Sequence, residues 1–310
     1  MKQDLRPISS AHAPQLADLW NAACGPDLAI TERFTAYNER EATGAARAGQ
    51  LAFVDGEPAG FVQVSAAPSG ESVSGWVDAI AVAPSRQRIG LGSQLLAWGE
   101  SWLAAQGCLR VRLGGGLRPY VPGLPDIPGN RAFFESRGYH YARPEWDVSR
   151  SLSDFAPTHP VPPDAVARQA TSADLAVLDA FLLHEFPGRW HFEFQEFLRE
   201  SGRPADYFLL WVDGAIAGFG RLTFEDSERP IDRFYPTPLS RPWGQLGPLG
   251  VARSLRGRGY GGVLVSAALE QLRRQGVDGC IIDWTNLLDF YAVFGFRPHR
   301  QYGVLIKELA

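Results

Sequence analysis

The chain carries one glycine-rich pattern twice. Residues 87–92 read QRIGLG and residues 256–261 read RGRGYG, so both copies fit [Q/R]-x-x-G-x-G. One offset of 169 residues relates three glycine pairs: Gly90 and Gly259, Gly92 and Gly261, and Gly107 and Gly276. A fixed offset over three positions indicates an internal duplication, because repeats keep their register where chance matches do not.

Hydrophobic periodicity predicts the same order of elements around each copy. Each half reads as two helices, a hairpin, a strand, the glycine turn, a long helix, a strand, a short helix and a last strand. In the first half the ranges are 13–23, 31–47, 50–54, 60–65, 76–82, 90–106, 109–113, 131–137 and from 139 onward. In the second half they are 171–183, 191–200, 207–212, 215–223, 246–251, 259–275, 279–283, 289–294 and 296–308.

A proline-rich stretch separates the halves. Four prolines within residues 157–163 disfavour both a helix and a central strand. We therefore expect domains at residues 1–149 and 165–310, joined by a linker at 150–164. The first half also has extra Gly/Pro-rich residues at 114–129, which are expected to form either a surface excursion or a substrate lid.

Composition favours a small-molecule partner. Thirty basic and 34 acidic residues give a net charge of -4, which disfavours binding to nucleic acid or an anionic membrane. Three cysteines without CxxC spacing are typical of free thiols in a reducing compartment. No apolar run approaches the ~20 residues of a membrane-spanning helix, so we expect a cytoplasmic protein. We expect it to be a monomer or a homodimer.

The repeated turn is suited to binding phosphate. Glycines at a helix N-terminus bring free backbone N–H groups close to a ligand, and the helix dipole favours an anion. Arg86, Arg88, Arg256 and Arg258 add positive charge. The alternative is a turn that only eases strand-to-helix packing. A dinucleotide-binding fold needs a different glycine spacing, and a Walker A loop needs a lysine that neither copy has.

These segments resemble the GCN5-related N-acetyltransferase (GNAT) superfamily. Residues 79–96, AIAVAPSRQRIGLGSQLL, and 249–264, LGVARSLRGRGYGGVL, are similar to its acetyl-CoA pyrophosphate-binding motif. Residues 290–296, FYAVFGF, resemble its F-Y-x-x-x-G-F segment, with 133–139, FFESRGY, as the partner. The resemblance implies two tandem GNAT-like α/β domains, each with a mixed, mostly antiparallel twisted sheet flanked by helices.

The same resemblance implies acetyl-CoA as the cofactor, with direct acetyl transfer and neither a metal nor a covalent acyl-enzyme. The strands ending at Val82 and Val251 would splay from a neighbour and pair with the pantetheine arm. The turns would hold the pyrophosphate through Gln87, Arg88, Ile89, Gly90, Leu91 and Gly92, and through Arg256, Gly257, Arg258, Gly259, Tyr260, Gly261 and Gly262.

The family's general acid, a tyrosine, maps onto Tyr291, and the matching residue of the first half is Phe134. Because a phenyl ring has no proton to donate, the C-terminal half is expected to be the catalyst and the N-terminal half a degenerate copy. A buried core tyrosine is the alternative for Tyr291. Asp78 is the candidate general base of the first half. The second half offers none on the matching strand, which leaves the loop acids Glu225, Asp226 and Asp232.

Acceptor choice is expected from the segment between the first two helices of the C-terminal half, where Glu185, Phe186 and Trp190 would hold an amine by charge and cation–π contact. These aromatics would otherwise seal the halves together. The sequence therefore predicts an acetyl-CoA-dependent N-acetyltransferase acting on a small-molecule amine or an amino terminus. The alternatives are a non-catalytic acyl-CoA-binding sensor or assembly protein, and aminoacyl-tRNA-dependent peptidyl transfer, which the acidic charge balance disfavours.

Overall fold

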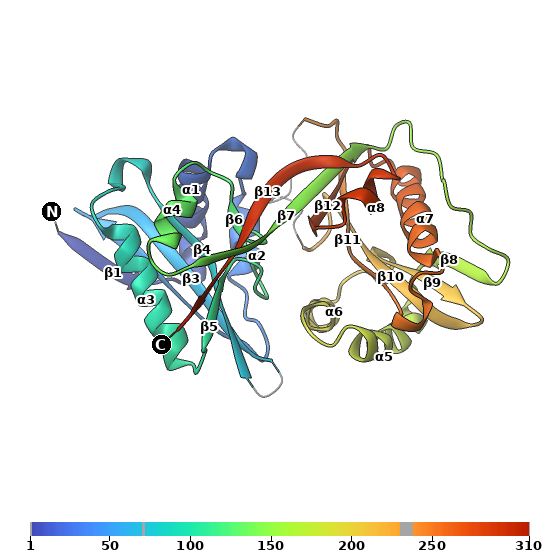
Figure 1. The fold of residues 1–310 in the computed structure, drawn as a ribbon, viewed down its shortest axis with the longest axis horizontal. Coiled ribbons are helices and arrows are strands. Elements are labelled where there is room, and N and C mark those ends of the chain that lie inside the picture. Colours follow the sequence, from blue (N-terminus) through green and yellow to red (C-terminus); the bar gives the residue numbers. More distant parts are fainter. Residues whose placement is uncertain (1, 70–71, 230–237, 310) are drawn as a thin grey trace. The chain divides into compact units, whose positions relative to one another are not determined.

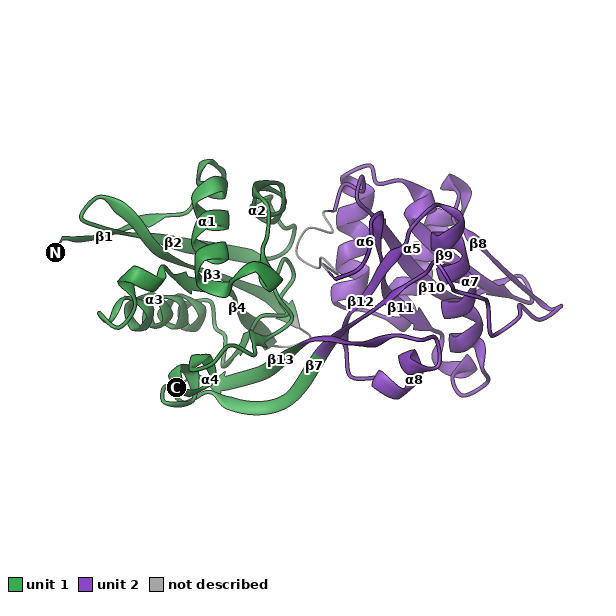
Figure 2. Ribbon diagram, turned by 90° about the horizontal axis from the view of Figure 1, so that it is seen from above, with its two compact units in different colours: residues 1–145, 301–310 green, residues 146–300 purple. Residues whose placement is uncertain are grey.

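The chain folds into two compact units of mixed α/β structure. The computed structural model describes residues 2–69, 72–229 and 238–309. Unit 1 contains residues 1–145 and 301–310, and unit 2 contains residues 146–300 (Figure 2). Within each unit a mostly antiparallel sheet is flanked by helices, as the duplicated pattern predicts.

Unit 1 is built on the strand order β1-β2-β3-β4-β5-β13. All neighbours in this sheet run antiparallel except β4 and β5. The strands are β1 (Gln3–Pro7), β2 (Ala46–Val54), β3 (Glu57–Ser69), β4 (Ser72–Val82), β5 (Arg110–Leu113) and β13 (Arg297–Glu308), with the short β6 (Leu124–Pro125) beside β13. The helices are α1 (Ala13–Cys24), α2 (Glu32–Asn38), α3 (Leu91–Ala105) and α4 (Asn130–Glu135), with short 3-10 turns η1 (Ser10–His12), η2 (Pro26–Leu28) and η3 (Pro84–Arg86).

Unit 2 repeats this plan in the order β8-β9-β10-β11-β12-β7, again with one parallel pair, β11 and β12. Its strands are β8 (Ala165–Gln169), β9 (Tyr207–Val212), β10 (Ala215–Phe224), β11 (Trp243–Val251), β12 (Gly279–Thr285) and the end of β7 (His140–Ser151). Its helices are α5 (Leu175–Glu185), α6 (Arg189–Arg199), α7 (Tyr260–Arg274) and α8 (Leu288–Ala292), with turns η4 (Ser172–Asp174), η5 (Pro204–Asp206) and η6 (Arg253–Leu255).

Each sheet ends in a strand from the other half of the sequence. In unit 1, β13 pairs with β5, joining Ile306 to Arg112. In unit 2, β7 pairs with β12, joining Ser151 to Gly279. Residues 301–310, predicted to lie in the second domain, therefore belong to unit 1, as their green colour in Figure 2 shows.

Residues 150–164, predicted as a linker, lie within unit 2. Phe155 is buried in the core of this unit, and the backbone N–H groups of Thr158 and His159 donate to Ser266 Oγ on α7. The segment therefore packs along α7 instead of spanning open solvent, since its one buried aromatic residue supplies an apolar anchor.

The long helix of each unit covers one face of its sheet, and the first two helices cover the other. In unit 1, Leu95 and Leu103 of α3 pack with Val62, whereas Trp20 of α1 packs with Phe61 from the opposite face of β3. Alternating side chains of one strand thus serve two cores, as the pleat requires. Unit 2 is layered in the same way, with α7 in one core and α5 and α6 in the other (Figure 1).

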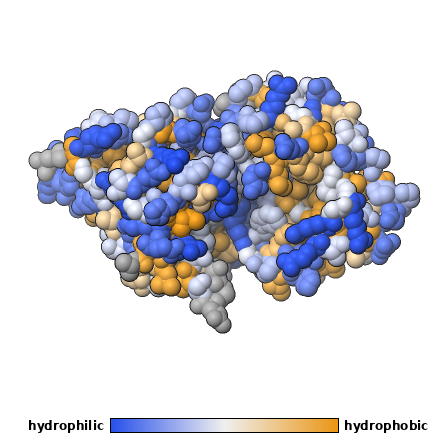
Figure 3. Space-filling model, viewed as in Figure 1, coloured by the Kyte–Doolittle hydropathy of each residue, from blue (hydrophilic) through white to orange (hydrophobic). Residues whose placement is uncertain are grey.

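The hairpins and the long helices are confirmed, but one predicted helix is too long. Asp55-Gly56 and Asp213-Gly214 all have positive φ, which a tight two-residue hairpin turn requires. The helix predicted over residues 31–47 ends at Asn38, and Gly44 turns with φ +76° into β2. None of the helices among the described residues is long and apolar enough to cross a membrane. Figure 3 shows polar side chains over much of the visible face, with smaller apolar areas between them.

Candidate functional site

Each unit contains a pair of parallel strands that separate halfway along their length. In unit 1, β4 pairs with β5 from Gly75 to Val77 and then continues to Val82 without it. In unit 2, β11 pairs with β12 from Trp243 to Gln245 and continues to Val251. The freed strand edges present backbone N–H and C=O groups to an extended ligand. Both predicted strand ends thus lie at an open edge.

The glycine turns follow these strands and begin the long helices. Gly90 and Gly259 are the N-cap residues of α3 and α7, with φ of +89° and +86°. Two positions earlier, Arg88 and Gly257 also have positive φ, at 64° and 77°. Alternating left-handed residues turn successive N–H groups toward one point and create an anion-binding nest. The two turns therefore share a backbone geometry that is suited to an anion.

Gly262 differs from the other predicted phosphate contacts. Its N–H donates to the Gly259 carbonyl at 2.9 Å and is already part of the helix. A Cβ atom on Gly262 would lie 2.5 Å from His159 Cδ2, so the imidazole covers this position. The amides of Arg258, Gly259, Tyr260 and Gly261 precede this first helical bond and are the free ones expected at a helix N-terminus.

The first side chain of each glycine turn donates a hydrogen bond to the last residue of the preceding strand. Gln87 Nε2 donates to the Val82 carbonyl at 3.2 Å, and Arg256 Nε donates to the Val251 carbonyl at 3.1 Å. These two positions correspond at the same offset as the glycines. The repeated contact therefore positions the glycine turn relative to the strand edge in both units.

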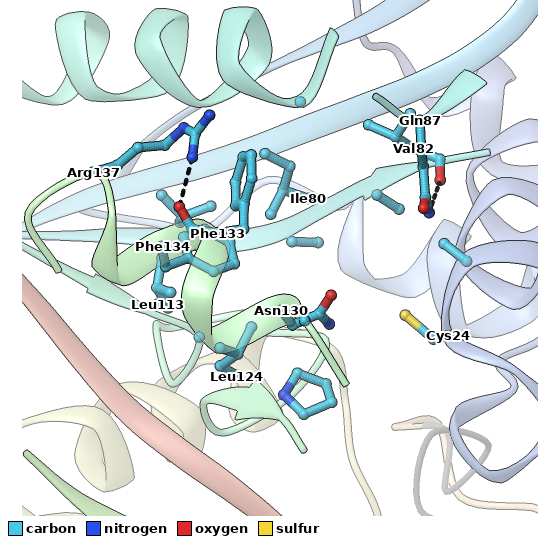
Figure 4. Close-up of a pocket in the computed structure, with 18 of the residues that line it drawn as sticks. Cys24, Ile80, Val82, Gln87, Leu113, Leu124, Asn130, Phe133, Phe134 and Arg137 are labelled. Atoms are coloured by element: carbon cyan, nitrogen blue, oxygen red, sulfur yellow. Dashed lines mark hydrogen bonds between the residues drawn. The ribbon is translucent and has the colours of Figure 1, made fainter. Parts of the chain in front are cut away.

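Unit 1 holds a cavity of about 610 Å³ between the end of β4, the glycine turn and α4 (Figure 4). Five predicted cofactor residues line it: Val82, Gln87, Arg88, Gly90 and Gly92. Two others do not, because Ile89 points outward with 40% exposure and Leu91 is buried in the core. Cys24 of α1 forms part of the opposite wall in Figure 4. The cavity follows the opened strand edge, where an extended arm ending in phosphate would lie.

The aromatic residues of α4 close the far side of this cavity. Phe134 is 5% exposed and packs edge-on against Phe133 and Tyr139. Arg137 donates to the Phe133 carbonyl at 2.7 Å, the bond drawn in Figure 4, and to Ser93 Oγ at 2.6 Å. Unit 1 therefore has a guanidinium beside the start of α3 and a phenyl ring where the matching position of unit 2 has a phenol.

Asp78 is among the residues that line the cavity, but its side chain is sealed from solvent. It occupies a β-bulge, since Gln63 pairs with Ala79 while Val64 pairs with Val77. The residue is 1% exposed, and neither carboxylate oxygen has a hydrogen-bond partner among the described residues. Burial raises the pKa of Asp78 to about 7, the positive charge of Arg47 opposes the rise, and the negative charge of Glu39 adds to it.

Residues 114–129 form the seal over Asp78. A Cβ atom on Gly116 would collide with Asp78 Oδ1 and lie 3.1 Å from Ser65 Oγ, so only a glycine permits this approach. Tyr120 is fully buried and packs against Trp20 and Phe34. The segment, expected to be a surface excursion or a lid, is instead anchored in the α1 core of unit 1.

The buried carboxyl of Asp78 predicts a pH-dependent stability. Its ordinary pKa of 3.8 rises to about 7 in the fold, so the native state binds the extra proton between these values. The contribution of Asp78 to the free energy of unfolding therefore falls as pH rises from about 4 to about 7. At pH 8 the buried carboxyl is ionised and destabilises the fold, and each pKa unit by which it is raised corresponds to about 1.4 kcal/mol of unfolding free energy. Asp78→Asn removes this charge, so it should raise the melting temperature by several degrees at pH 8 and change it little at pH 4, where the carboxyl is protonated in the fold. Calorimetric melting at both pH values checks this, and an equal shift at both would contradict it.

Tyr291 of unit 2 lies on α8 at 5% exposure. Its ring packs edge-on against Phe290, with ring centroids 5.0 Å apart. Burial raises the pKa of Tyr291, and the negative charge of Asp283 adds to the rise. The phenol therefore keeps its proton at neutral pH and lies within electrostatic range of a carboxylate.

Asp283 lies at the strand opening of unit 2, where no sequence pattern predicted an acid. It lies on β12 where that strand parts from β11, and its Oδ1 accepts from Gln245 Nε2 at 2.7 Å. A Cβ atom on Gly247 would lie 3.2 Å from the same oxygen. The acid was expected on the strand before the glycine turn, whereas Asp283 stands across the gap on the next strand, at the repeat position of Gly114.

The loop acids considered for unit 2 are otherwise engaged. Glu225 accepts hydrogen bonds from Nε and Nη2 of Arg241, at 2.9 and 2.7 Å. These bonds hold the pKa of Glu225 below its usual value. Asp226 pairs with Arg203 at 3.0 Å. Asp232 lies outside the described residues.

The aromatic segment of unit 2 lies against the strand that leads to the glycine turn. Phe186 and Trp190 pack on Phe219, and a Cβ atom on Gly250 would lie 2.5 Å from Phe186 Cζ. Glu185 accepts the N–H of Arg253 at 2.8 Å. These predicted acceptor residues are therefore on the sheet face opposite α7, beside β11.

The same segment reaches the end of β12 through Arg189. Its guanidinium lies 3.6 Å from the centre of the Trp284 ring, and Trp284 directly follows Asp283. Arg189 also pairs with Glu193 at 3.1 Å. The segment predicted to select the acceptor therefore contacts the residue that follows Asp283 on β12.

Comparisons with known proteins agree with this geometry. The model of the acetyltransferase (GNAT) family matches residues 13–117 and 175–296. A mycothiol acetyltransferase of Nocardia farcinica is 29% identical, over 80% of this chain and 78% of that protein. Another from Salinispora arenicola is 30% identical, over 72% of this chain and 68% of that protein.

Solved structures share the tandem architecture. The glucosamine N-acetyltransferase region of a fungal multi-domain GH3 beta-N-acetylglucosaminidase has a TM-score of 0.87 at 22% identity, covering 98% of this chain and 38% of that one. A tandem GNAT protein from the clavulanic acid biosynthesis pathway has a TM-score of 0.73 at 19% identity, covering 100% of this chain and 99% of that one.

Proposed function

Because the chain belongs to the acetyltransferase (GNAT) family and is an acyltransferase, we propose that it transfers an acetyl group from acetyl-CoA to the amine of a small molecule. The observation that carries the proposal is the repeated opening between parallel strands, followed by a left-handed glycine at a helix N-terminus. Acetyl-CoA, when bound, supplies the acetyl group as a thioester.

The residues of both openings fit this cofactor. The edges of β4 and β11 offer backbone pairing to a pantetheine arm, and the turns before Gly92 and Gly261 offer N–H groups to the pyrophosphate. In unit 1 the cavity of about 610 Å³ provides the room. Arg88 and Arg258 add charge at the phosphate end.

We assign turnover to unit 2, where Tyr291 holds a proton at its hydroxyl for the leaving sulfur. Burial and Asp283 keep the phenol protonated at neutral pH, so its hydroxyl has a proton to donate. The aromatic segment around Phe186 and Trp190 supplies an apolar wall for the acceptor, and Glu185 adds a negative charge near it.

Unit 1 favours the second candidate function, cofactor binding without turnover. Its cavity and phosphate turn remain, but Phe134 has no proton to donate and residues 114–129 bury Asp78. A sealed carboxyl cannot receive a proton from an acceptor that never reaches it. We therefore propose that unit 1 is a degenerate copy that binds acyl-CoA as a structural or sensing element.

The acceptor we propose is a small primary amine. One structural relative is a glucosamine N-acetyltransferase region, which makes glucosamine a first acceptor to test. The net charge of -4 favours cationic acceptors over nucleic acid. The free thiols Cys24, Cys108 and Cys280 favour a reducing compartment such as the cytoplasm.

The test is acetyl transfer to a panel of amines that includes glucosamine and benzylamine, followed by release of free CoA thiol. We expect thiol release above the rate of acetyl-CoA hydrolysis, together with an acetylated amine in mass spectrometry. Glucose and benzyl alcohol are the matched controls that lack an amine. With them, thiol release should be no faster than the hydrolysis of acetyl-CoA. Thiol release that no amine accelerates would contradict N-acetyl transfer, and calorimetric CoA binding in that same protein would favour the sensor.

A further inference from the structure

We infer that Asp283 and Gln245 form the ammonium-binding pair of unit 2, and that Asp283 takes the proton that the acceptor amine must lose. This inference rests on the proposed function and names the class of its acceptor, a protonated primary amine. It also supplies the base that the strand before the glycine turn lacks.

The pair lies at the point where β11 and β12 part. Gln245 is in the last paired position of β11, opposite Ile281, and Asp283 is two residues further along β12. The bond from Gln245 Nε2 to Asp283 Oδ1 fixes the carboxylate at the mouth of the opening. Gly247 has no side chain to fill the space beside that oxygen, where a Cβ atom would lie 3.2 Å away.

Two buried polar atoms near this point lack a hydrogen-bond partner among the described residues. Gln245 is 1% exposed, and its Oε1 has no hydrogen-bond partner among the described residues. The same holds for Oγ1 of Thr223, the cross-strand neighbour of Gln245 on β10. An unmatched amide oxygen beside a carboxylate needs a donor, and an ammonium group carries three of them.

The charged groups around Asp283 leave it available as a base. Tyr291 of α8 is neutral at ordinary pH, since burial and Asp283 raise its pKa. Arg189, whose guanidinium lies over the Trp284 ring, pairs with Glu193 of α6, and the backbone N–H of Trp284 donates to Asp147 of β7 at 3.3 Å. Asp147 in turn pairs with Arg300 at 3.6 Å.

The duplicate unit places its carboxylate on the opposite strand. Asp78 of β4 corresponds to Gly247, and Gly114 after β5 corresponds to Asp283, at the common offset of 169 residues. Unit 1 buries its carboxylate under Gly116, whereas Asp283 is half-buried and keeps a path to solvent. The half-buried carboxylate can receive a proton from an acceptor and pass it to water.

The proton balance closes with these two residues. One proton passes from the ammonium to Asp283 and then to solvent, which leaves a lone pair on the nitrogen. The N–C bond forms as the C–S bond of the thioester breaks, and Tyr291 donates its proton to the sulfur. Tyr291 regains a proton from the acylated nitrogen, so each turnover consumes one ammonium and releases one proton.

The test compares Asp283→Asn with the matched control Asp289→Asn in the full chain, using glucosamine and benzylamine as acceptors. At pH 7 we expect kcat/KM for the amine to fall at least tenfold in Asp283→Asn and to stay unchanged in Asp289→Asn, whose side chain is exposed on α8. The loss should shrink as pH rises, because the free amine then binds without giving up a proton.

Two further readouts separate this role from a structural one. Calorimetric CoA affinity should stay within a few-fold of wild type in Asp283→Asn, and Asp283→Glu should restore part of the activity. Wild-type activity with an unchanged pH profile in Asp283→Asn would overturn the assignment and leave the proposed function intact. A wild-type protein that acetylates no amine would overturn both.

Discussion

Gly259→Val should abolish CoA binding in unit 2 and with it turnover. Gly259 has φ +86° with nothing within 4 Å of a Cβ atom, so the valine side chain would project into the space where phosphate approaches the turn. A β-branched residue also strains a left-handed position by about 1–2 kcal/mol. Isothermal calorimetry with CoA measures the loss directly, and thiol release with an amine acceptor measures its effect on kcat/KM.

Gly276→Val is the matched control for this change. Gly276 has φ +87°, also has open space around it and lies at the opposite end of the same helix. Gly276→Val should introduce the same backbone strain and leave the affinity for CoA unchanged. Equal CoA affinity in Gly259→Val and wild type would remove the phosphate-binding role of the turn, and Gly90→Val would show whether unit 1 binds CoA by itself.

Tyr291→Phe should lower kcat by roughly 10²-fold while CoA affinity stays within a few-fold of wild type, because a general acid acts on the leaving group and not on binding. The ring is packed against Phe290 and Phe296, so phenylalanine keeps these contacts and the fold. Steady-state kinetics and CoA calorimetry together measure both quantities.

The matched control is Tyr141→Phe, which removes the hydroxyl of a half-buried tyrosine in unit 1. Its turnover should equal that of wild type. Equal kcat in Tyr291→Phe and Tyr141→Phe would assign Tyr291 to the core alone. Loss of turnover in a folded Gly90→Val protein, with normal turnover in Gly259→Val, would move catalysis to unit 1.

Local patterns predicted most of the fold. The Asp-Gly pairs at 55–56 and 213–214 mark hairpins because their left-handed turn restricts the residues that fit. Strand β1, with mostly exposed residues in the order QDLRP, lacks the apolar alternation that marks a strand and was missed. The partners of β7 and β13 depend on contacts between distant parts of the chain, which periodicity does not encode.

The candidate site was predictable to the same extent. The glycine turns are contiguous in sequence, so their spacing located Gly90 and Gly259, which are the left-handed N-cap residues of α3 and α7. Asp283 acquires its place only through the register of β12 against β11, because two residues separate it from the last paired position. Likewise, composition marked residues 114–129 as irregular but carried no sign that Tyr120 would be fully buried.

The exchange of end strands sets an order of events during synthesis. Unit 1 requires residues 301–310 beside β5, so the first half of the chain leaves the ribosome with one edge of its sheet open. That edge stays unpaired until the second half has been translated, and open strand edges readily recruit other chains. Chaperone demand should therefore peak while translation passes through unit 2, and a ribosome stalled there would hold a nascent chain in which unit 1 cannot complete its sheet.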